Sequence, residues 1–347
     1  MRGGAGGASS FFPSSCGLSG GLAGAVCRGT GRRHMSGNIA ARVAAIDVLA
    51  PTLRRFVLAA SDRPFPPVSA GSHAVLAFGD ETRRWKNPYS IVNAAEDGSS
   101  LTVIIRREES ARGGSAFLHD RAMVGMRVDV ASIGNLFPIV RTARRHLMVS
   151  GGIGITPFLA YIEAFERIGA DYMLLHVCRP DERAAFANLL PDGLKGDVRI
   201  HAGRRALDLP ALLAAQPVGT RLYACGPDGF MDHVATCARQ VGFPDMKIHL
   251  ERFSAAAGGA AFTVTLARDG RRIAVGADQT LLEALEAAGV DVPSLCRGGA
   301  CGMCRVRVLD GRPDHRDHVL TKAERMAGTE ILTCVSRTMG ATLTLDL

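Results

Sequence analysis

The chain has 347 residues, of which 47% are apolar and 21% charged, and it carries a formal charge of +8. This length predicts two or three folded domains, and no apolar run reaches the roughly 18 residues of a membrane span. The basic residues form no stripe interleaved with aromatics, so we expect a soluble, cytoplasmic protein that binds neither nucleic acid nor membrane.

Residues 1–34 are rich in Gly, Ser and Ala and show no periodic apolar pattern. They contain arginines and no acid, a composition shared by organelle transit peptides. The many glycines weaken any amphipathic helix, and Met35 is a plausible true start. We expect residues 1–34 to be a disordered leader or an upstream extension.

Residues 38–140 predict an antiparallel β-domain. Short runs rich in β-branched residues are separated by Pro, Gly and Asp turns, which is typical of a small six-stranded barrel or sandwich. Strands are expected over 41–50, 53–60, 73–78, 89–93, 101–107 and 127–132, with one short helix over 115–121.

Residues 143–253 change to apolar strands that alternate with amphipathic helices, the pattern of a doubly wound parallel sheet of about five strands. In the stretch SGGIGITPFLA, Gly151, Gly152 and Gly154 allow a pyrophosphate or nicotinamide to approach the backbone, and Pro157 suits a first helical turn. The stretch lacks the ordinary G-x-G-x-x-G fingerprint. Cys225-Gly226-Pro227 ends another strand, where parallel sheets bind ligands; a buried structural cysteine is the alternative.

Residues 254–261, SAAAGGAA, lack charge and periodicity and predict a flexible linker. The last domain, residues 262–347, opens with a predicted hairpin and a helix around 281–288. After the cysteine-rich loop we expect a helical turn near 321–326 and two closing strands, one containing Cys334 and one at TLTLDL.

The cysteines of this last domain have a specific spacing. Four residues separate Cys296 from Cys301, two separate Cys301 from Cys304, and Cys334 follows after a further 29. This is the plant-type pattern of [2Fe–2S] ligands, and the intervening glycines let the backbone aim N–H groups at the sulfurs. Structural zinc favours paired C-x2-C units, and a disulfide framework favours short, cysteine-dense chains in oxidising compartments.

A cluster that carries one electron cannot accept a hydride, so a chain that joins it to a nucleotide domain needs a flavin between them. The β-domain is the candidate holder. In WKNPYSIV, an aromatic ring beside a hydroxyl could flank the flavin ring, and Gly113-Gly114-Ser115 before the short helix could hold its phosphate. The alternatives are ordinary core packing for the first stretch and a simple turn with an N-cap for the second.

Together these motifs resemble the phthalate dioxygenase reductase and vanillate O-demethylase reductase family, within the ferredoxin-reductase-like superfamily, over about residues 38–347. The resemblance implies an FMN-binding barrel, an NAD domain and a C-terminal β-grasp ferredoxin domain. It implies that Asn87, Tyr89, Ser90, Arg106, Gly113, Gly114, Ser115 and Phe253 bind FMN, and that Gly151, Gly152, Gly154, Thr156, Pro157, Cys225, Gly226 and Pro227 bind the nucleotide. It further implies that Thr156, Cys225 and Glu251 lie at the reacting centre, and that Cys296, Cys301, Cys304 and Cys334 bind the cluster.

The chain departs from the family at one position, because Asn87 stands where the family's R-x-Y-S motif has arginine. The family role is a reductase that passes electrons from NADH, through FMN and the cluster, to a terminal oxygenase of Rieske type. FAD and NADPH are the less favoured cofactors: Asp181 and Glu182 could take a ribose hydroxyl, whereas Arg179 and Arg183 could take a 2′-phosphate. The alternative functions are a reductase for a haem monooxygenase or a soluble ferredoxin, and a non-catalytic zinc-binding adaptor.

Overall fold

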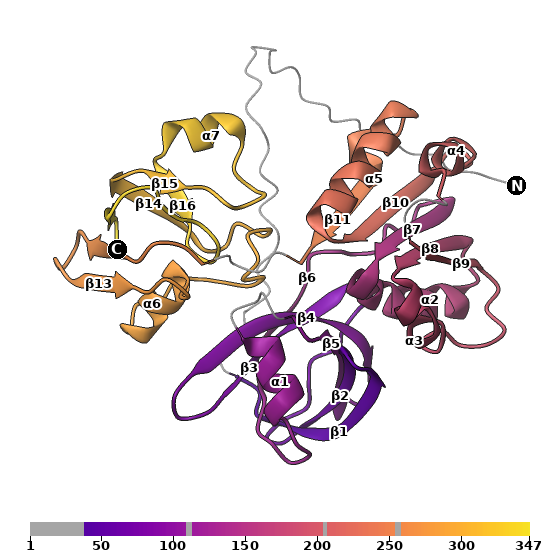
Figure 1. Ribbon diagram of the computed structural model, residues 1–347, viewed down its shortest axis with the longest axis horizontal. Helices are drawn as coiled ribbons and strands as arrows, with labels where there is room; N and C mark the ends of the chain where they lie inside the picture. Colours follow the sequence, from indigo (N-terminus) through magenta and orange to yellow (C-terminus); the bar gives the residue numbers. More distant parts are fainter. Residues whose placement is uncertain (1–37, 109–112, 204–206, 254–257) are drawn as a thin grey trace, which may run out of the picture. The chain divides into compact units, whose positions relative to one another are not determined.

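The computed structural model describes residues 38–108, 113–203, 207–253 and 258–347. The predicted leader, residues 1–34, lies outside the described residues, and so do residues 254–257 of the predicted linker. The described chain forms an antiparallel barrel, a parallel sheet with helices on both faces, and a mixed sheet with helices (Figure 1).

The barrel is the six-stranded antiparallel sheet predicted for the first domain. Its strand order is β1-β2-β5-β4-β3-β6, and bridges from Ile39 to Val130 and from Arg42 to Arg127 link its two ends. Alternate side chains of each strand fill the core, as the period of two requires. The elements are β1 (Ala41–Ala50), β2 (Leu53–Ala60), β3 (Ser72–Gly79), β4 (Arg84–Ala94), β5 (Ser100–Arg106), α1 (Gly114–Arg121) and β6 (Asp129–Asn135).

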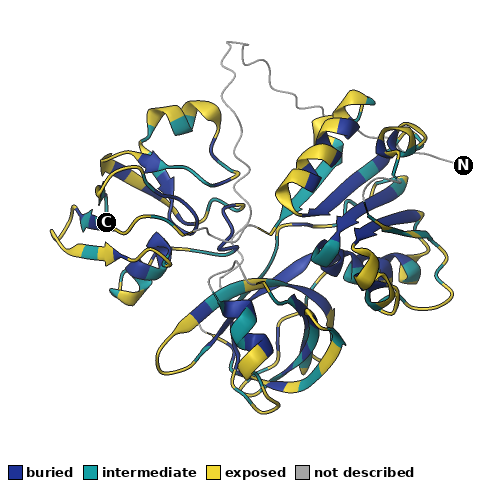
Figure 2. Ribbon diagram, in the orientation of Figure 1, coloured by how far each residue is buried: buried dark blue, intermediate teal, exposed yellow. Residues whose placement is uncertain are grey.

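The second sheet is parallel throughout, in the order β11-β10-β7-β8-β9, which confirms the doubly wound prediction. Met148 of β7 packs in the core with α2 and α3, whereas its neighbours Leu147 and Val149 pack in the core with α4 and α5. Figure 2 shows the central strands as buried and α5 as exposed on its outer side. The elements are β7 (Arg145–Gly151), η1 (Gly152–Ile155), α2 (Thr156–Ile168), β8 (Tyr172–Cys178), η2 (Pro180–Glu182), α3 (Arg183–Ala187), β9 (Asp197–Ala202), α4 (Leu209–Ala214), β10 (Thr220–Gly226), α5 (Asp228–Gln240), η3 (Asp245–Lys247) and β11 (Ile248–Arg252).

The third sheet has the order β13-β12-β18-β14-β16, with β12 and β18 parallel and α6 packed in its core, as in a β-grasp domain. The strand predicted around Cys334 is wrong: Cys334 lies in a turn between β16 and β17, where its backbone is free of the sheet ladder. The elements are β12 (Phe262–Leu266), β13 (Arg272–Val275), α6 (Leu281–Ala287), β14 (Arg305–Asp310), β15 (Pro313–Asp314), α7 (Lys322–Ala327), β16 (Glu330–Leu332), β17 (Arg337–Thr338) and β18 (Thr342–Leu345).

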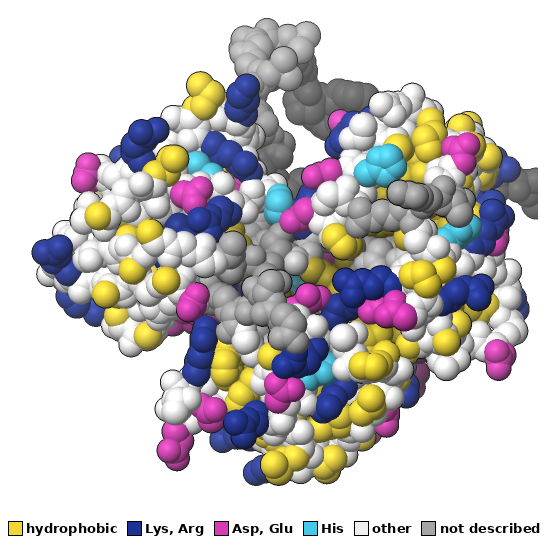
Figure 3. All heavy atoms as spheres, viewed as in Figure 1, with side chains coloured by type: hydrophobic (Ala, Val, Ile, Leu, Met, Phe, Trp, Pro, Cys, Tyr) yellow, Lys and Arg dark blue, Asp and Glu magenta, His cyan; other side chains and the backbone are white. Residues whose placement is uncertain are grey.

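No helix within the described ranges is long and apolar enough to cross a membrane. On the face drawn in Figure 3, basic and acidic side chains are interspersed.

Candidate functional site

The two glycine-containing motifs of the parallel sheet meet at its topological switch point. Strands β7 and β10 are neighbours, and the helices that follow them pack in different cores, α2 in one and α5 in the other. In such sheets the ligand crevice opens outside the carboxyl ends of the two strands at the switch. Gly151 ends β7 and Gly226 ends β10, so both predicted nucleotide motifs lie at this end of the sheet.

The contact between these motifs is close enough to require glycine. A methyl group on Gly154 would lie 2.3 Å from the carbonyl oxygen of Cys225 and 2.7 Å from the nitrogen of Gly226. Gly152 has φ of +55°, a left-handed conformation in which a side chain is strained. Thr156 then starts α2, its hydroxyl donating to the Ile153 carbonyl at 3.0 Å, and Pro157 follows in the first turn.

Cys225 and Glu251 are register partners on β10 and β11. Burial raises the pKa of the Cys225 thiol, so the group is a neutral thiol at neutral pH. Burial also raises the pKa of the Glu251 carboxyl to about 8. Its Oε2 is buried without a hydrogen-bond partner among the described residues, so the carboxyl holds a proton over most of the neutral range.

Phe253 follows directly after β11, at the same end of the sheet. Its side chain is 42% exposed, unlike the other large apolar side chains of the nearby core. An exposed aromatic ring at a crevice is available to pack on a planar ligand.

Tyr89 and Ser90 are consecutive residues of β4 in the barrel. The Ser90 hydroxyl is buried and has no hydrogen-bond partner among the described residues. Burial raises the pKa of Tyr89 to about 12, and its oxygen accepts a hydrogen bond from Asn87 Nδ2 at 3.3 Å. Pro88 is tolerated because this part of β4 pairs with β3 alone; pairing with β5 begins at Ile91.

The predicted phosphate motif forms the start of α1, with Gly113 as its N-cap at φ +90°. A methyl group on Gly114 would lie 2.4 Å from Asn87 Nδ2, so the Asn87 amide stands directly at the helix start. The Trp85 and Phe117 rings, 4.9 Å apart, hold α1 against β4. Free N–H groups at a helix start beside an amide donor suit a phosphate. Ser115 Oγ accepts from the Glu108 N–H at 3.1 Å.

Arg106 was predicted to hold the flavin phosphate, and that role stays a prediction. In the structure its Nη2 donates to Glu182 Oε1 at 2.6 Å, which ties β5 of the barrel to η2 of the parallel-sheet domain. This pairing also bears on nucleotide choice, because Glu182 is buried, whereas Arg179, Asp181 and Arg183 are exposed.

The four predicted ligand cysteines converge in the third domain. The thiols of Cys301 and Cys334 donate hydrogen bonds to the Cys296 sulfur and lower its pKa, and the Cys334 thiol lowers the pKa of Cys304 to about 7. The backbone N–H groups of Gly298 and Ala300 each lie 3.4 Å from Cys296 Sγ. Sulfurs gathered under backbone donors fit an iron–sulfur cluster.

No group of three or more His, Cys, Asp or Glu side chains in the described ranges is arranged to hold a metal ion by itself. A binuclear cluster instead distributes its four thiolates over two irons. The four cysteines are therefore assigned as cluster ligands from their spacing in the sequence and the convergence of their sulfurs.

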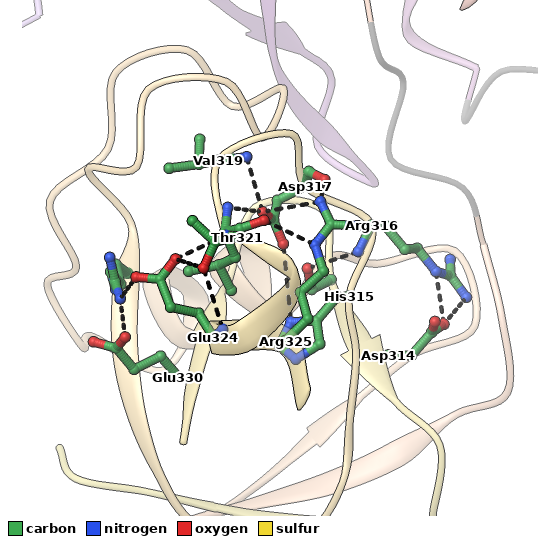
Figure 4. Close-up of polar contacts among 12 residues, drawn as sticks. Asp314, His315, Arg316, Asp317, Val319, Thr321, Glu324, Arg325 and Glu330 are labelled. Carbon is green, nitrogen blue, oxygen red and sulfur yellow. Dashed lines mark hydrogen bonds and ion pairs between the residues drawn. The ribbon is translucent and has the colours of Figure 1, made fainter. Parts of the chain in front are cut away.

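The segment DHRDHVL, residues 314–320, contacts the loop that carries these cysteines. Figure 4 shows the polar contacts of Asp317 and Arg325 in and beside this segment. Asp317 is buried, and its Oδ2 accepts from the N–H groups of Val319 at 3.0 Å and Leu320 at 2.7 Å. The N–H of His318 donates to the Gly299 carbonyl within the cysteine loop at 3.0 Å. A methyl group on Gly299 would lie 2.7 Å from a Val335 side-chain carbon, so the loop lies close to the turn of Cys334.

Sequence patterns gave no signal for a buried pair below the glycine loop. Ser150 Oγ and His176 Nδ1 are 2.8 Å apart on neighbouring strands β7 and β8. Burial, followed by the charge of Arg106, lowers the pKa of His176 to about 3, so its ring is neutral. Only the register of the sheet brings these two residues together.

Comparison with known proteins agrees with this geometry. The family described as "2Fe-2S iron-sulfur cluster binding domain" matches residues 264–339, and the "Dimethylamine monooxygenase subunit DmmA-like, N-terminal domain" matches residues 133–248. The heme-dependent oxidative N-demethylase beta subunit of Ectopseudomonas mendocina is 41% identical over 90% of this chain and all of its own. The vanillate O-demethylase oxidoreductase of a Pseudomonas species is 39% identical over 81% of this chain and 91% of its own.

Among solved structures, phthalate dioxygenase reductase, described as a modular structure for electron transfer from pyridine nucleotides to [2Fe-2S], superimposes with a TM-score of 0.79 and 32% identity. That match covers 90% of this chain and 98% of the reductase. Fold and site thus define an electron-transfer oxidoreductase with a [2Fe–2S] domain. The chain belongs to the phthalate dioxygenase reductase and vanillate O-demethylase reductase family.

Proposed function

We propose that the protein oxidises NADH at the switch-point crevice and delivers the electrons, through FMN and a [2Fe–2S] cluster, to a terminal oxygenase in the cytoplasm. The observation that carries this proposal is the presence, in one chain, of a close glycine contact between two parallel strand ends, at Gly154 and Cys225, and of four converging cysteines. The first suits a two-electron donor and the second a one-electron carrier. A flavin, when bound, accepts a hydride and releases electrons singly.

The barrel supplies a fitting site for the flavin. The unpartnered Ser90 hydroxyl offers a hydrogen bond to the edge of the ring, and Tyr89 offers its aromatic face. The start of α1, with Gly113, Gly114, Ser115 and the Asn87 amide, would hold the phosphate. Arg106 remains part of this proposed set, and Phe253 would pack against the ring.

The switch-point residues would bind and orient the nicotinamide. The backbone of Gly151, Gly152 and Gly154 permits close approach, Thr156 and Pro157 start the helix, and the Cys225-Gly226-Pro227 corner forms the opposite wall. The Cys225 thiol is neutral and polarizable, which suits packing against the ring. Glu251 holds its proton on a buried carboxyl beside this wall.

Cys296, Cys301, Cys304 and Cys334 would bind the cluster as thiolates. The donors from Gly298 and Ala300 stabilise negative charge on the Cys296 sulfur and so help to set the potential of the cluster. Cys301 is the most accessible of the four cysteines, which suits an exit for electrons.

Two classes of terminal oxygenase are candidates for the electron acceptor. The family resemblance of the sequence favours a Rieske-type oxygenase as the acceptor. A haem-dependent oxygenase is the second candidate, because a relative with 41% identity over its whole length is the beta subunit of a haem-dependent N-demethylase.

The test begins with the purified protein. About two irons and about two acid-labile sulfides for each FMN are expected, with faster turnover of NADH than of NADPH; zinc in a colourless protein would contradict the proposal. Reconstitution with a Rieske oxygenase and, separately, with a haem-dependent demethylase then identifies the acceptor. If the protein reduces cytochrome c but neither oxygenase, the acceptor would instead be a soluble ferredoxin.

A further inference from the structure

A largely buried ion pair joins the barrel to the turn after β8. Arg106 Nη2 and Glu182 Oε1 are 2.6 Å apart, and their side chains are 15% and 7% exposed. Arg106 ends β5 of the barrel, whereas Glu182 ends η2, directly after β8 of the parallel sheet. Most of the other ion pairs in the described residues are more exposed and lie within one domain.

The start of β2 and the turn before it fix the backbone of the arginine. Leu53 of β2 pairs with Arg106, and the following N–H, of Arg107, donates to the Thr52 carbonyl at 2.9 Å. The Thr52 hydroxyl also lies 3.5 Å from Glu182 Oε1. Leu53 itself is fully buried in the core that contains Phe158 of α2. Two polar groups of the barrel therefore converge on one carboxylate oxygen of the other domain.

The guanidinium group lies against the turn that starts the nucleotide loop. A methyl group on Gly152 would be 3.6 to 3.8 Å from three atoms of the guanidinium, which is ordinary contact distance. On the next strand, the charge of Arg106 contributes, after burial, to the lowered pKa of His176. The neutral His176 ring in turn is hydrogen-bonded to the Ser150 hydroxyl, with Nδ1 and Oγ 2.8 Å apart. The cation thus lies beside the glycine turn and influences the nearby Ser150–His176 pair.

Because the pair is largely buried, loss of either partner should be costly. A buried ion pair contributes little net stability, but removing one partner leaves a charge without compensation in a low-dielectric site. Arg106 Nε and Glu182 Oε2 have no further hydrogen-bond partner among the described residues, so each side chain depends mainly on the other. A loosened pair would let the turn at Gly152 shift relative to the barrel.

Resting on the proposed function, we infer that Arg106 and Glu182 are positioning residues, which hold the nicotinamide turn at Gly152 in a fixed place relative to the flavin barrel. Their effect falls on the rate of hydride transfer rather than on nucleotide affinity, because misplacement by about 1 Å costs up to about a hundredfold in rate. Glu182 is therefore a link between domains and not a ribose ligand.

The test compares Glu182→Gln and Arg106→Lys with Asn93→Ala. Asn93 Nδ2 donates to Glu163 Oε2 at 3.2 Å, so the control also removes a bond between β4 and α2, at an exposed place. For each variant, flavin content, the Kd for NAD+ and the limiting rate of flavin reduction at saturating NADH are measured. Hydrogen exchange of the amides over 151–155 adds a readout that needs no turnover.

We expect both pair variants to keep the Kd for NAD+ within about twofold and to slow the limiting rate about tenfold or more, with faster exchange over 151–155. Asn93→Ala should match the parent in all of these. A raised Kd with an unchanged limiting rate would overturn the inference and make the pair a nucleotide-binding element. If Glu182→Gln fails to fold, Arg106→Lys, which keeps the charge, decides by the same measurements. A parent protein that binds no flavin or is not reduced by NADH contradicts the proposed function instead.

Discussion

The proposed nucleotide crevice and the proposed cluster site are formed by different parts of the chain. The crevice is made by backbone, with glycines that leave room at Gly154 and Gly152, and its walls come from strands far apart in sequence. The pocket is made by side chains, and three of its four sulfurs come from one loop, residues 296–304. A nucleotide that binds reversibly needs space between the walls, whereas a cluster that is retained permanently needs bonds from iron to thiolate sulfur. Changes at the two places should therefore fail differently.

The largest effect is expected at the pocket. Cys301→Ser removes one thiolate ligand, so the cluster should be lost or impaired, and electron delivery to an oxygenase should fall at least about a hundredfold. Flavin reduction by NADH should remain within about twofold, as followed by stopped-flow absorbance. Cys237→Ser, at a buried cysteine of α5 outside the pocket, is the control. Delivery at the parent rate by Cys301→Ser would show that the cluster is not on the route.

At the proposed crevice, Gly154→Ala should impair NADH binding, which is the entry point of the electrons, almost as strongly as Cys301→Ser impairs their exit. Its new methyl group would meet the Cys225 carbonyl at 2.3 Å and push the two walls apart. We expect KM for NADH to rise at least about tenfold and stability to fall by about 1–3 kcal/mol. Iron and sulfide content should stay normal.

The matched change is Gly229→Ala in α5, where an added methyl group meets nothing within 4 Å. This variant should keep the parent KM and gain up to about 1 kcal/mol, since alanine is the better helix former. Equal KM values for the two variants would contradict the proposed closeness of the walls.

A moderate effect is expected in the barrel. Ser90→Ala removes a buried hydroxyl that has no partner among the described residues, so the protein without flavin should be no less stable than the parent. With flavin bound, loss of a hydrogen bond should weaken FMN binding or slow its reduction by about threefold to tenfold. Thermal unfolding with and without FMN separates the two states. A loss of stability in the flavin-free protein would mean that the hydroxyl has a structural partner.

The last effect concerns the dependence of stability on pH. The Glu251 carboxyl has a pKa of about 8 when folded, against 4.5 as the ordinary value, so the folded state favours the protonated form. Its contribution to stability is therefore complete below about pH 4.5 and is lost as the pH rises toward 8. Glu251→Gln, which cannot ionise, should gain in Tm relative to the parent as the pH increases over this range. A Tm difference that stays constant from pH 5 to 8 would show that the carboxyl is not desolvated.

The sequence predicted most of the fold because its local patterns agree with the tertiary structure. The period of two in the barrel strands and the alternation of strands and helices after Arg145 both appear as predicted. The strand expected at Cys334 was wrong, since an apolar run there signals burial and not sheet pairing: Ile331 to Val335 are buried across a strand end and a turn.

The site was predictable where a chemical requirement fixes spacing, and not where the fold brings distant residues together. The cysteine spacing pointed to the convergent thiols, and the glycine loop pointed to the crevice. The pairs Arg106–Glu182 and Ser150–His176 had no such signal, because each joins strands or domains whose register appears only in the folded chain. The sequence singled out Arg106 and Glu182 for other roles, and no local pattern marks the members of either pair as partners.

The central claim is that electrons enter in pairs at the crevice and leave singly through the cysteine pocket. Anaerobic titration of the purified protein with NADH, with flavin absorbance and the electron paramagnetic resonance of the cluster recorded together, tests it directly. The account predicts that NADH bleaches the flavin and produces the signal of a reduced [2Fe–2S] cluster, and that removal of the flavin abolishes the cluster signal. A cluster signal of full size in flavin-free protein, or a bleached flavin beside a cluster that stays oxidised, would contradict it.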